Sequence, residues 1–240
     1  MNQETLVTIG NFLFKWRNKL VPLTIIMLFL MAHPLITGPF VKTLALSLAI
    51  GGLALRGIVI GYAYIKRGGV NKKVYAADLV TDGMFGVCRN PLYVGNVLIY
   101  TGLFLFHGHP LVIVLGVPLF LFFYVSLVAA EEAYLANKFG EGYQEYCRDV
   151  PRWSLKLSRF EESTKGMTFN LWRVITKDYT TAATTLITLT LTEVYRYATL
   201  PKGADTPMIY IGFLSLMVVG FGIAVLAIKK IKKEKATPAA

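Results

Sequence analysis

Charged residues and cysteines are scarce in this sequence, and each shortage narrows what the chain can be. Only 16% of the 240 residues are charged, whereas a soluble domain carries about a quarter. The two cysteines, Cys88 and Cys147, lack metal-ligand spacing and provide no disulfide framework. No small-residue cleavage site follows a short apolar core at the N-terminus, so we predict no cleavable signal peptide.

Apolar residues are abundant instead, and they gather in blocks. Hydrophobic residues make up 55% of the chain, and they cluster in stretches of about 20, the length of a helix that crosses a bilayer. The sequence therefore predicts an all-α membrane protein with about six transmembrane helices. The blocks are residues 20–36, 41–65, 92–106, 111–130, 181–200 and 208–228.

Lys and Arg outnumber Asp and Glu by 25 to 14, an excess that also occurs in nucleic-acid-binding proteins. Their placement favours a topological role instead, because 21 of the 25 lie in residues 1–20, 66–91, 131–179 and the tail from Lys229. Basic clusters beside apolar helices stay on the cytoplasmic side. We therefore expect both termini and every long loop in the cytoplasm, and no nucleic-acid partner.

Two stretches beside the predicted spans have the pattern of helices that lie on a membrane surface. In residues 5–20 and 169–179, apolar side chains recur every three or four positions with basic residues between them. We divide the chain accordingly into three parts. These are residues 1–19, an interfacial helix; residues 20–160, a core of four spans; and residues 161–240, an extension with two further spans and a basic tail.

The fifth block contains the run TTLITLTLT, whose alternation is typical of a β-strand. An unpaired strand is excluded from a bilayer because its backbone would lack hydrogen-bond partners, so a helix is predicted. On that helix Thr181, Thr185, Thr188 and Thr192 form a polar stripe. Such a stripe should face other helices and not lipid.

Two polar motifs, residues 78–95 and 131–153, flank the hairpin made by the third and fourth blocks. The hairpin returns the chain to the side from which it started, so both motifs should meet at one cytoplasmic surface.

Within the first motif, Gly83 and Gly86 permit tight turns or close backbone approach. Asn90 fits a helix cap, with Pro91 at the first helical position. Such a helix start presents free amide groups that suit a carboxylate. The alternative is that Asn90 and Pro91 are only a cap.

In the second motif, Glu131 and Glu132 directly follow an apolar helix, and Phe139-Gly140 should end it. A helix C-terminus disfavours acids, and desolvation adds to the cost. A cation should therefore lie nearby, unless the two acids are an ordinary pair at the headgroup level. The candidates are Arg89, Arg148, Arg152 or a bound ligand.

The runs RNPLYVG and EEAYLANKFGEGYQEYCRDVPRW resemble the signature of the isoprenylcysteine carboxyl methyltransferase and phospholipid methyltransferase superfamily. The resemblance covers about 75 residues. It implies an integral, multi-pass membrane methyltransferase that binds S-adenosylmethionine at the cytoplasmic face and takes a lipophilic acceptor from the bilayer. Under this resemblance, residues 20–160 form the methyltransferase core, with the cofactor motifs at 78–95 and 131–153.

Carried onto this chain, the resemblance implies two overlapping sets of site residues. The cofactor-binding set is Gly83, Gly86, Arg89, Asn90, Tyr93, Gly95, Glu131, Glu132 and Tyr146. The catalytic set is Glu132, Tyr143 and Arg152.

Asn90 stands where the carboxyl methyltransferases of the group usually have His, which moves the match toward a phospholipid amine as acceptor. A prenylated-cysteine carboxylate and a small lipophilic thiol remain alternatives. A protonated amine would have to lose its proton before it is methylated, and Glu131, Glu132 or Tyr143 could assist.

Arg56 lies about ten residues, or roughly 15 Å, from the cytoplasmic end of the second block. A charge near mid-membrane costs several kcal/mol and is a functional candidate. Two hypotheses stay open, an ion pair with Glu193 or binding of an acidic group on the acceptor. The neighbouring pair Gly57 and Gly61 fits close helix packing, either within the chain or in a homodimer.

His33, His107 and His109 all fall on the predicted non-cytoplasmic side. They leave open a haem- or quinone-binding membrane subunit, although histidines in short loops are more often plain surface residues. We predict no metal site. A non-catalytic membrane scaffold is a third class that the sequence permits.

Overall fold

The computed structural model describes residues 2–62, 74–200 and 208–236, and every regular element in these ranges is a helix. The predicted all-α fold is therefore confirmed, and each apolar block forms a long helix. The long helices are α1 (Gln3–Leu30), α2 (Pro39–Tyr62), α3 (Pro91–His107), α4 (Pro110–Asp149), α6 (Leu171–Ala198) and α7 (Met208–Ala236). Short elements are η1 (Gly83–Phe85), η2 (Leu157–Arg159) and α5 (Phe160–Ser163).

Among the described residues, three helices are long and apolar enough to cross a membrane by length and composition: Pro39–Tyr62, Pro110–Asp149 and Met208–Lys233. α3 is apolar but shorter. The number of six spans, and the cytoplasmic placement of both termini, therefore stay predictions.

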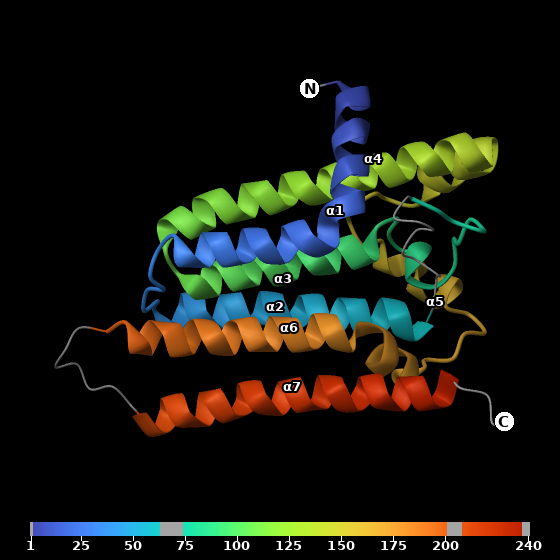
Figure 1. Cartoon of the computed structure of the whole chain (residues 1–240). Helices are drawn as coiled ribbons and strands as arrows, with labels where there is room; N and C mark the ends of the chain where they lie inside the picture. The colour runs from blue at the N-terminus through green and yellow to red at the C-terminus, as the bar shows by residue number, and fades with distance from the viewer. Residues whose placement is uncertain (1, 63–73, 201–207, 237–240) are drawn as a thin grey trace.

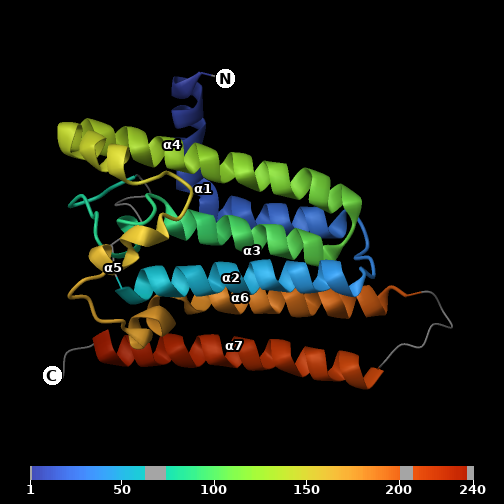
Figure 2. The ribbon, with the colours of Figure 1, turned by 180° about the vertical axis from the view of Figure 1, so that it is seen from behind.

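The long helices lie side by side and alternate in direction, with α4 at one edge and α7 at the other (Figures 1 and 2). α7 packs on α6, and α6 packs on α2 and α3. The end of the bundle where α2 ends, α3 begins and α4 ends is called the site end below. It lies on the right in Figure 1 and also carries the start of α6.

α1 runs without interruption through the predicted interfacial helix and into the first predicted span, and the division of the chain between these two parts stays a prediction. Its first part nevertheless runs across the other helices, and its second part runs along them (Figure 1). Pro22 lies inside α1. An interior proline removes one helical hydrogen bond and bends the helix. The location of the first part on a membrane surface stays a prediction.

α2 and α3 make the closest helix pair, because glycines let their backbones approach. A Cβ atom added at Gly52 would lie 2.5 Å from the carbonyl oxygen of Gly95, and one at Gly102 would lie 2.6 Å from that of Ala45. Small residues at a membrane-helix interface favour such packing.

The pair Gly57 and Gly61 is used within the chain. A Cβ atom at Gly61 would collide with the ring of Phe169, and one at Gly57 would lie 3.5 Å from Val174. Both glycines thus face the start of α6 and the residues before it. A homodimer through this pair stays an untested prediction.

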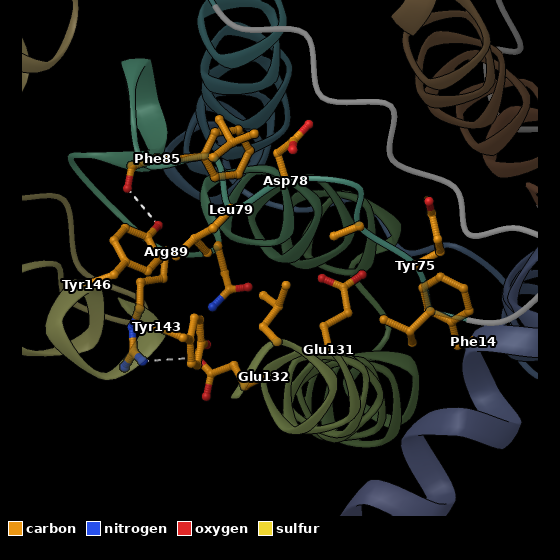
Figure 3. Close-up of a pocket in the computed structure, with 15 residues that line it drawn as sticks. Phe14, Tyr75, Asp78, Leu79, Phe85, Arg89, Glu131, Glu132, Tyr143 and Tyr146 are labelled. Carbon is orange, nitrogen blue, oxygen red and sulfur yellow. Dashed lines mark hydrogen bonds and ion pairs between the residues drawn. The ribbon is translucent and has the colours of Figure 1, made fainter. Parts of the chain in front are cut away.

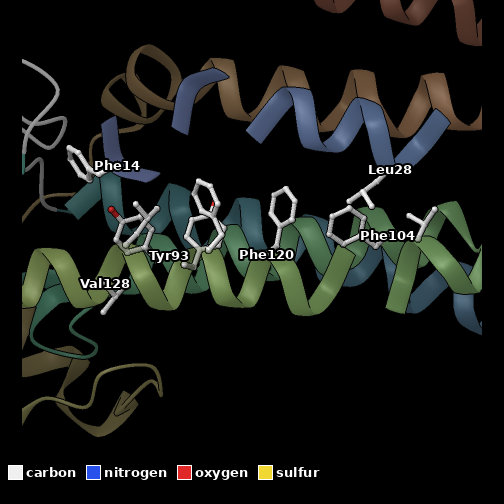
Figure 4. Packing of buried hydrophobic residues seen from close by; sticks show 10 residues of the cluster. Phe14, Leu28, Tyr93, Phe104, Phe120 and Val128 are labelled. Carbon is white, nitrogen blue, oxygen red and sulfur yellow. The ribbon is translucent and has the colours of Figure 1, made fainter. Parts of the chain in front are cut away.

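Aromatic rings fill the space between α1, α3 and α4 (Figure 4). Phe104 and Phe120 meet edge to face with their centroids 5.1 Å apart. Phe14 and Tyr93 extend the same cluster toward the site end. The cluster ties α1 to the α3–α4 hairpin and so helps to position the site.

We predict opposite effects for alanine at two adjacent glycines of α2. Gly52→Ala should lower the free energy of unfolding by about 1–3 kcal/mol, because the new methyl group collides with α3. Gly51→Ala meets nothing within 4 Å and should stabilise by up to about 1 kcal/mol through helix propensity. Thermal unfolding in detergent measures both. Equal melting temperatures for the two variants would contradict this account of the α2–α3 interface.

Candidate active site

The two sequence motifs meet around a cavity at the site end (Figure 3). Its empty space is about 690 Å³, part of it open to solvent. The walls come from α1, from the segment that precedes α3, and from α4 on both sides of Gly140. The polar lining residues include Asp78, Arg89, Asn90, Glu131, Glu132 and Tyr143.

Gly83 and Gly86 shape the turn behind the cavity wall. Gly83 has a φ of 62°, which favours glycine. Gly86 lies so close to Ser163 that a Cβ atom would collide with its hydroxyl group, which itself donates to the carbonyl of Gly83 at 2.6 Å. Neither glycine lines the cavity, whereas Phe85 between them does. Their predicted contact with a cofactor stays a prediction.

Pro91 begins α3 at its first position, as predicted. Asn90 stands at the cap position, but its side chain makes no capping bond. Its amide instead donates to the carbonyl oxygen of Arg152 at 3.3 Å, and the backbone N–H of Arg89 donates to the carbonyl oxygen of Pro151 at 2.9 Å. These bonds join the first motif to the end of the second.

Glu132 is a buried carboxylate at the centre of an ion-pair cluster. Arg152 donates through Nε to its Oε1 at 3.1 Å and pairs through a second nitrogen with Oε2. Arg89 lies 3.4 Å from the same carboxylate. The cation predicted beside the acidic pair is therefore present, supplied by both arginines. Arg152 itself is not among the residues that line the cavity, and it acts by holding Glu132.

The tyrosines of the second motif sit after Gly140, where α4 is interrupted by a φ of 52° and a ψ of −123°. This break agrees with the predicted helix end. Tyr146 donates to the carbonyl oxygen of Phe85 at 2.7 Å. Burial raises the pKa of Tyr143, and the charge of Glu132 raises it further, so its phenol keeps its proton at neutral pH. Tyr143 can therefore donate a hydrogen bond but is unsuited to be a base.

A second, larger space lies between α1 and α6, and residues of α2, α3 and α4 also line it. We call it the groove. Its empty volume is about 1810 Å³, part of it open. Glu131 lines both the cavity and the groove. Tyr93 lines the groove and donates its hydroxyl proton to Glu131. The acid is therefore placed at the junction of the two spaces.

Gly95, also predicted to contact a cofactor, lies instead at the α2–α3 interface. A Cβ atom there would be 2.6 Å from Cγ of Arg56. The cavity is also lined by three residues that the sequence analysis did not predict as site residues, Phe14, Tyr75 and Asp78. Asp78 opens the first motif, and an acid at that point was a signal that could have been used.

Arg56 pairs with Asp178, so the predicted pair with Glu193 is wrong. Its Nε donates to Oδ2 of Asp178 at 3.0 Å, and its NH1 donates to Asn96 at 2.7 Å. Glu193 pairs instead with Lys42 at 2.6 Å and with Arg196.

The apolar block predicts that the fifth helix starts near residue 181, whereas α6 begins at Leu171. Fifteen residues, or about 22 Å of helix, separate Asp178 from Glu193. Asp178 is the only acidic residue between Glu162 and Glu193. This isolated acid was the sequence signal that could have identified the partner of Arg56.

The three histidines have separate surroundings. His107 is fully buried, with its ring 4.7 Å from that of Phe29. His33 lies 3.0 Å from the hydroxyl oxygen of Tyr195, and His109 accepts from the backbone of Leu111. In the described ranges no group of three or more His, Cys, Asp or Glu residues could hold a metal ion.

Known proteins resemble parts of this chain. Residues 40–142 match the family described as phospholipid methyltransferase. The cobalt-zinc-cadmium resistance protein CzcN of Cupriavidus metallidurans is 30% identical over 136 residues, which are 56% of this chain and 61% of that protein. The protein-S-isoprenylcysteine O-methyltransferase of Schizosaccharomyces pombe is 34% identical over 73 residues, which are 30% of this chain and 31% of that protein. The chain thus spans less than two thirds of either relative, and no solved structure matches it.

These matches agree with the bundle and with the junction of the two motifs. Residues 40–142 are thus similar to the phospholipid methyltransferase family, and a shorter stretch of the chain is similar to an isoprenylcysteine O-methyltransferase. The apolar helices of the chain make it an integral membrane protein. The family match ends at residue 142, so α6 and α7 lie outside it.

Charge exchange between Arg56 and Asp178 tests the pairing within the bundle. Arg56→Asp or Asp178→Arg alone should lower the free energy of unfolding by about 3–5 kcal/mol, because each leaves buried like charges together. The double variant should recover part of this loss in thermal unfolding. The matched control is Arg56→Glu with Glu193→Arg, which should recover nothing. A double exchange with Asp178 that is no more stable than its worse single variant would contradict the pair.

Proposed function

We propose that this chain is an S-adenosylmethionine-dependent methyltransferase that methylates the amine of a membrane lipid, with its site facing the cytoplasm. The observation that carries the proposal is the position of Glu131. This carboxylate lies in the wall shared by a polar cavity and a groove between membrane helices. Transfer between a water-soluble donor and a lipid acceptor requires such a junction.

The residues of the cavity suit the methyl donor. Nε of Arg89 is buried and has no hydrogen-bond partner among the described residues, so it is available to a carboxylate group. Asn90 and Asp78 offer oxygen atoms to an ammonium group or to ribose hydroxyls.

S-adenosylmethionine, when bound, supplies a methyl group on a sulfonium, and the C–S bond breaks with its electron pair on sulfur as the acceptor nitrogen's lone pair forms the C–N bond. A lipid ammonium must first lose one proton to provide that lone pair. Glu131 is the carboxylate placed to accept it, because Glu132 is already held by two arginines and Tyr143 keeps its own proton.

Charge also favours an amine over the other acceptors. A carboxylate at the junction attracts a cationic group and repels an anionic one. The carboxylate of a prenylated cysteine and the thiolate of a small lipophilic thiol would both meet Glu131 with like charge. The cytoplasmic orientation is supported by the distribution of Lys and Arg, since the loops at the site end hold most of them.

Titration with S-adenosylhomocysteine tests the cavity. Glu132→Gln should weaken binding at least about tenfold, since it breaks the ion pairs that position Arg89. The matched control is Glu141→Gln on the exposed surface of the same helix, which should bind as the wild type does. If the folded wild-type protein fails to bind, the methyltransferase proposal is wrong.

Glu131→Gln should slow methyl transfer while it leaves the binding of S-adenosylhomocysteine nearly unchanged. We expect about a 100-fold lower rate of labelled methyl transfer to phosphatidylethanolamine, with the affinity for S-adenosylhomocysteine changed less than threefold. The rate of this variant should recover as the pH rises, because more of the lipid amine is then already neutral. Label that appears in base-labile methyl esters would instead indicate a carboxylate acceptor.

A further inference from the structure

The outer wall of the groove comes from α6, which lies outside the segment that matches the family. We propose that this groove binds the acceptor lipid and that the threonine face of α6 selects lipids with a glycerophosphate group next to the amine. The proposal rests on the proposed function and assigns a specificity role to the C-terminal extension. The threonines that line the groove are Thr180, Thr181, Thr184, Thr185 and Thr188.

Thr180, Thr185 and Thr188 present hydroxyl groups without a partner among the described residues, and of these three only Thr180 is exposed. Thr184, Thr190 and Thr192 donate to the backbone carbonyl four residues earlier, the usual way in which a membrane helix satisfies a hydroxyl group. Thr185 and Thr188 make no hydrogen bond with any part of the chain that the structure describes, although Thr185 is only 3% exposed. Both hydroxyl groups are therefore available to an ester or phosphate oxygen of a lipid in the groove.

The groove has charged side chains at its site end and apolar side chains deeper in the bundle. Glu131 and Arg17 line its site end, where they match an amine and a phosphate. The α6 hydroxyls line one side of the groove along this length. Ile25 and Leu103 line it deeper in the bundle, with Ile25 eight residues, or about 12 Å, beyond Arg17 on α1. These apolar side chains match the acyl tails.

Arg56 holds this wall in place. It lines the groove, but its guanidinium is bound by Asp178 on α6, by Asn96 on α3 and by the hydroxyl oxygen of Thr181 at 3.3 Å. Its charge is therefore already neutralised within the protein. In this proposal Arg56 is a positioning residue that fixes the depth and rotation of α6, in place of the direct acceptor contact that the sequence suggested.

The test compares two amines in detergent micelles, diacyl phosphatidylethanolamine and octadecylamine, which has no phosphate or ester groups. Thr185→Val with Thr188→Val should lower kcat/KM for the phospholipid about tenfold, the effect of losing two hydrogen bonds. The value for octadecylamine should change less than threefold, and binding of S-adenosylhomocysteine should be unchanged. The control is Thr190→Val, at a buried threonine of the same helix outside the groove. It should leave kcat/KM unchanged for both amines.

Three other outcomes would overturn the proposal, and each shows which part of it is wrong. If the double variant behaves as Thr190→Val does, the α6 wall does not select the lipid, while methyl transfer still stands. A wild-type protein that uses both amines equally well would likewise show that the α6 wall does not select the lipid. If it binds S-adenosylhomocysteine but labels neither amine, the lipid-amine acceptor is wrong, and this proposal is wrong with it.

Discussion

Charges inside an apolar helix bundle have to be paired, because an isolated buried charge costs several kcal/mol. In this protein the pairs connect segments that are far apart in the chain, so they determine how the helices meet. Arg56 on α2 engages Asp178 on α6, and Glu132 on α4 engages Arg89 before α3. A third group joins α2 to α6 at the opposite end of the bundle, through Lys42, Glu193 and Arg196.

The pairing of Glu132 has a consequence for the site. Two arginines hold this carboxylate, and the adjacent Glu131 is left facing both the cavity and the groove, with a hydrogen bond from Tyr93. Neighbouring acids on one helix point in different directions, because successive residues are about 100° apart. A structural acid and a reactive acid can therefore stand side by side.

Much of the fold follows from local sequence signals, and part of the site does as well. Hydrophobic blocks, the Asn90-Pro91 helix start and the break at Gly140 act over a few residues, so each could be located in advance. The meeting of the two motifs followed from the hairpin topology. Gly95 could not be placed in advance, because the sequence does not say which way a helix is rotated. It faces α2 and not the cavity, since a glycine is needed where Arg56 crosses α3.

By itself the sequence determined that the chain is a bundle of apolar helices with its polar motifs gathered at one end, because helix length and turn chemistry are local properties. Only the tertiary structure decided which charges meet and which threonines of α6 face a groove. Those contacts depend on the relative depth and rotation of helices. Arg56 and Asp178, which are 122 residues apart in the chain, are partners only because α2 and α6 pack antiparallel at that register.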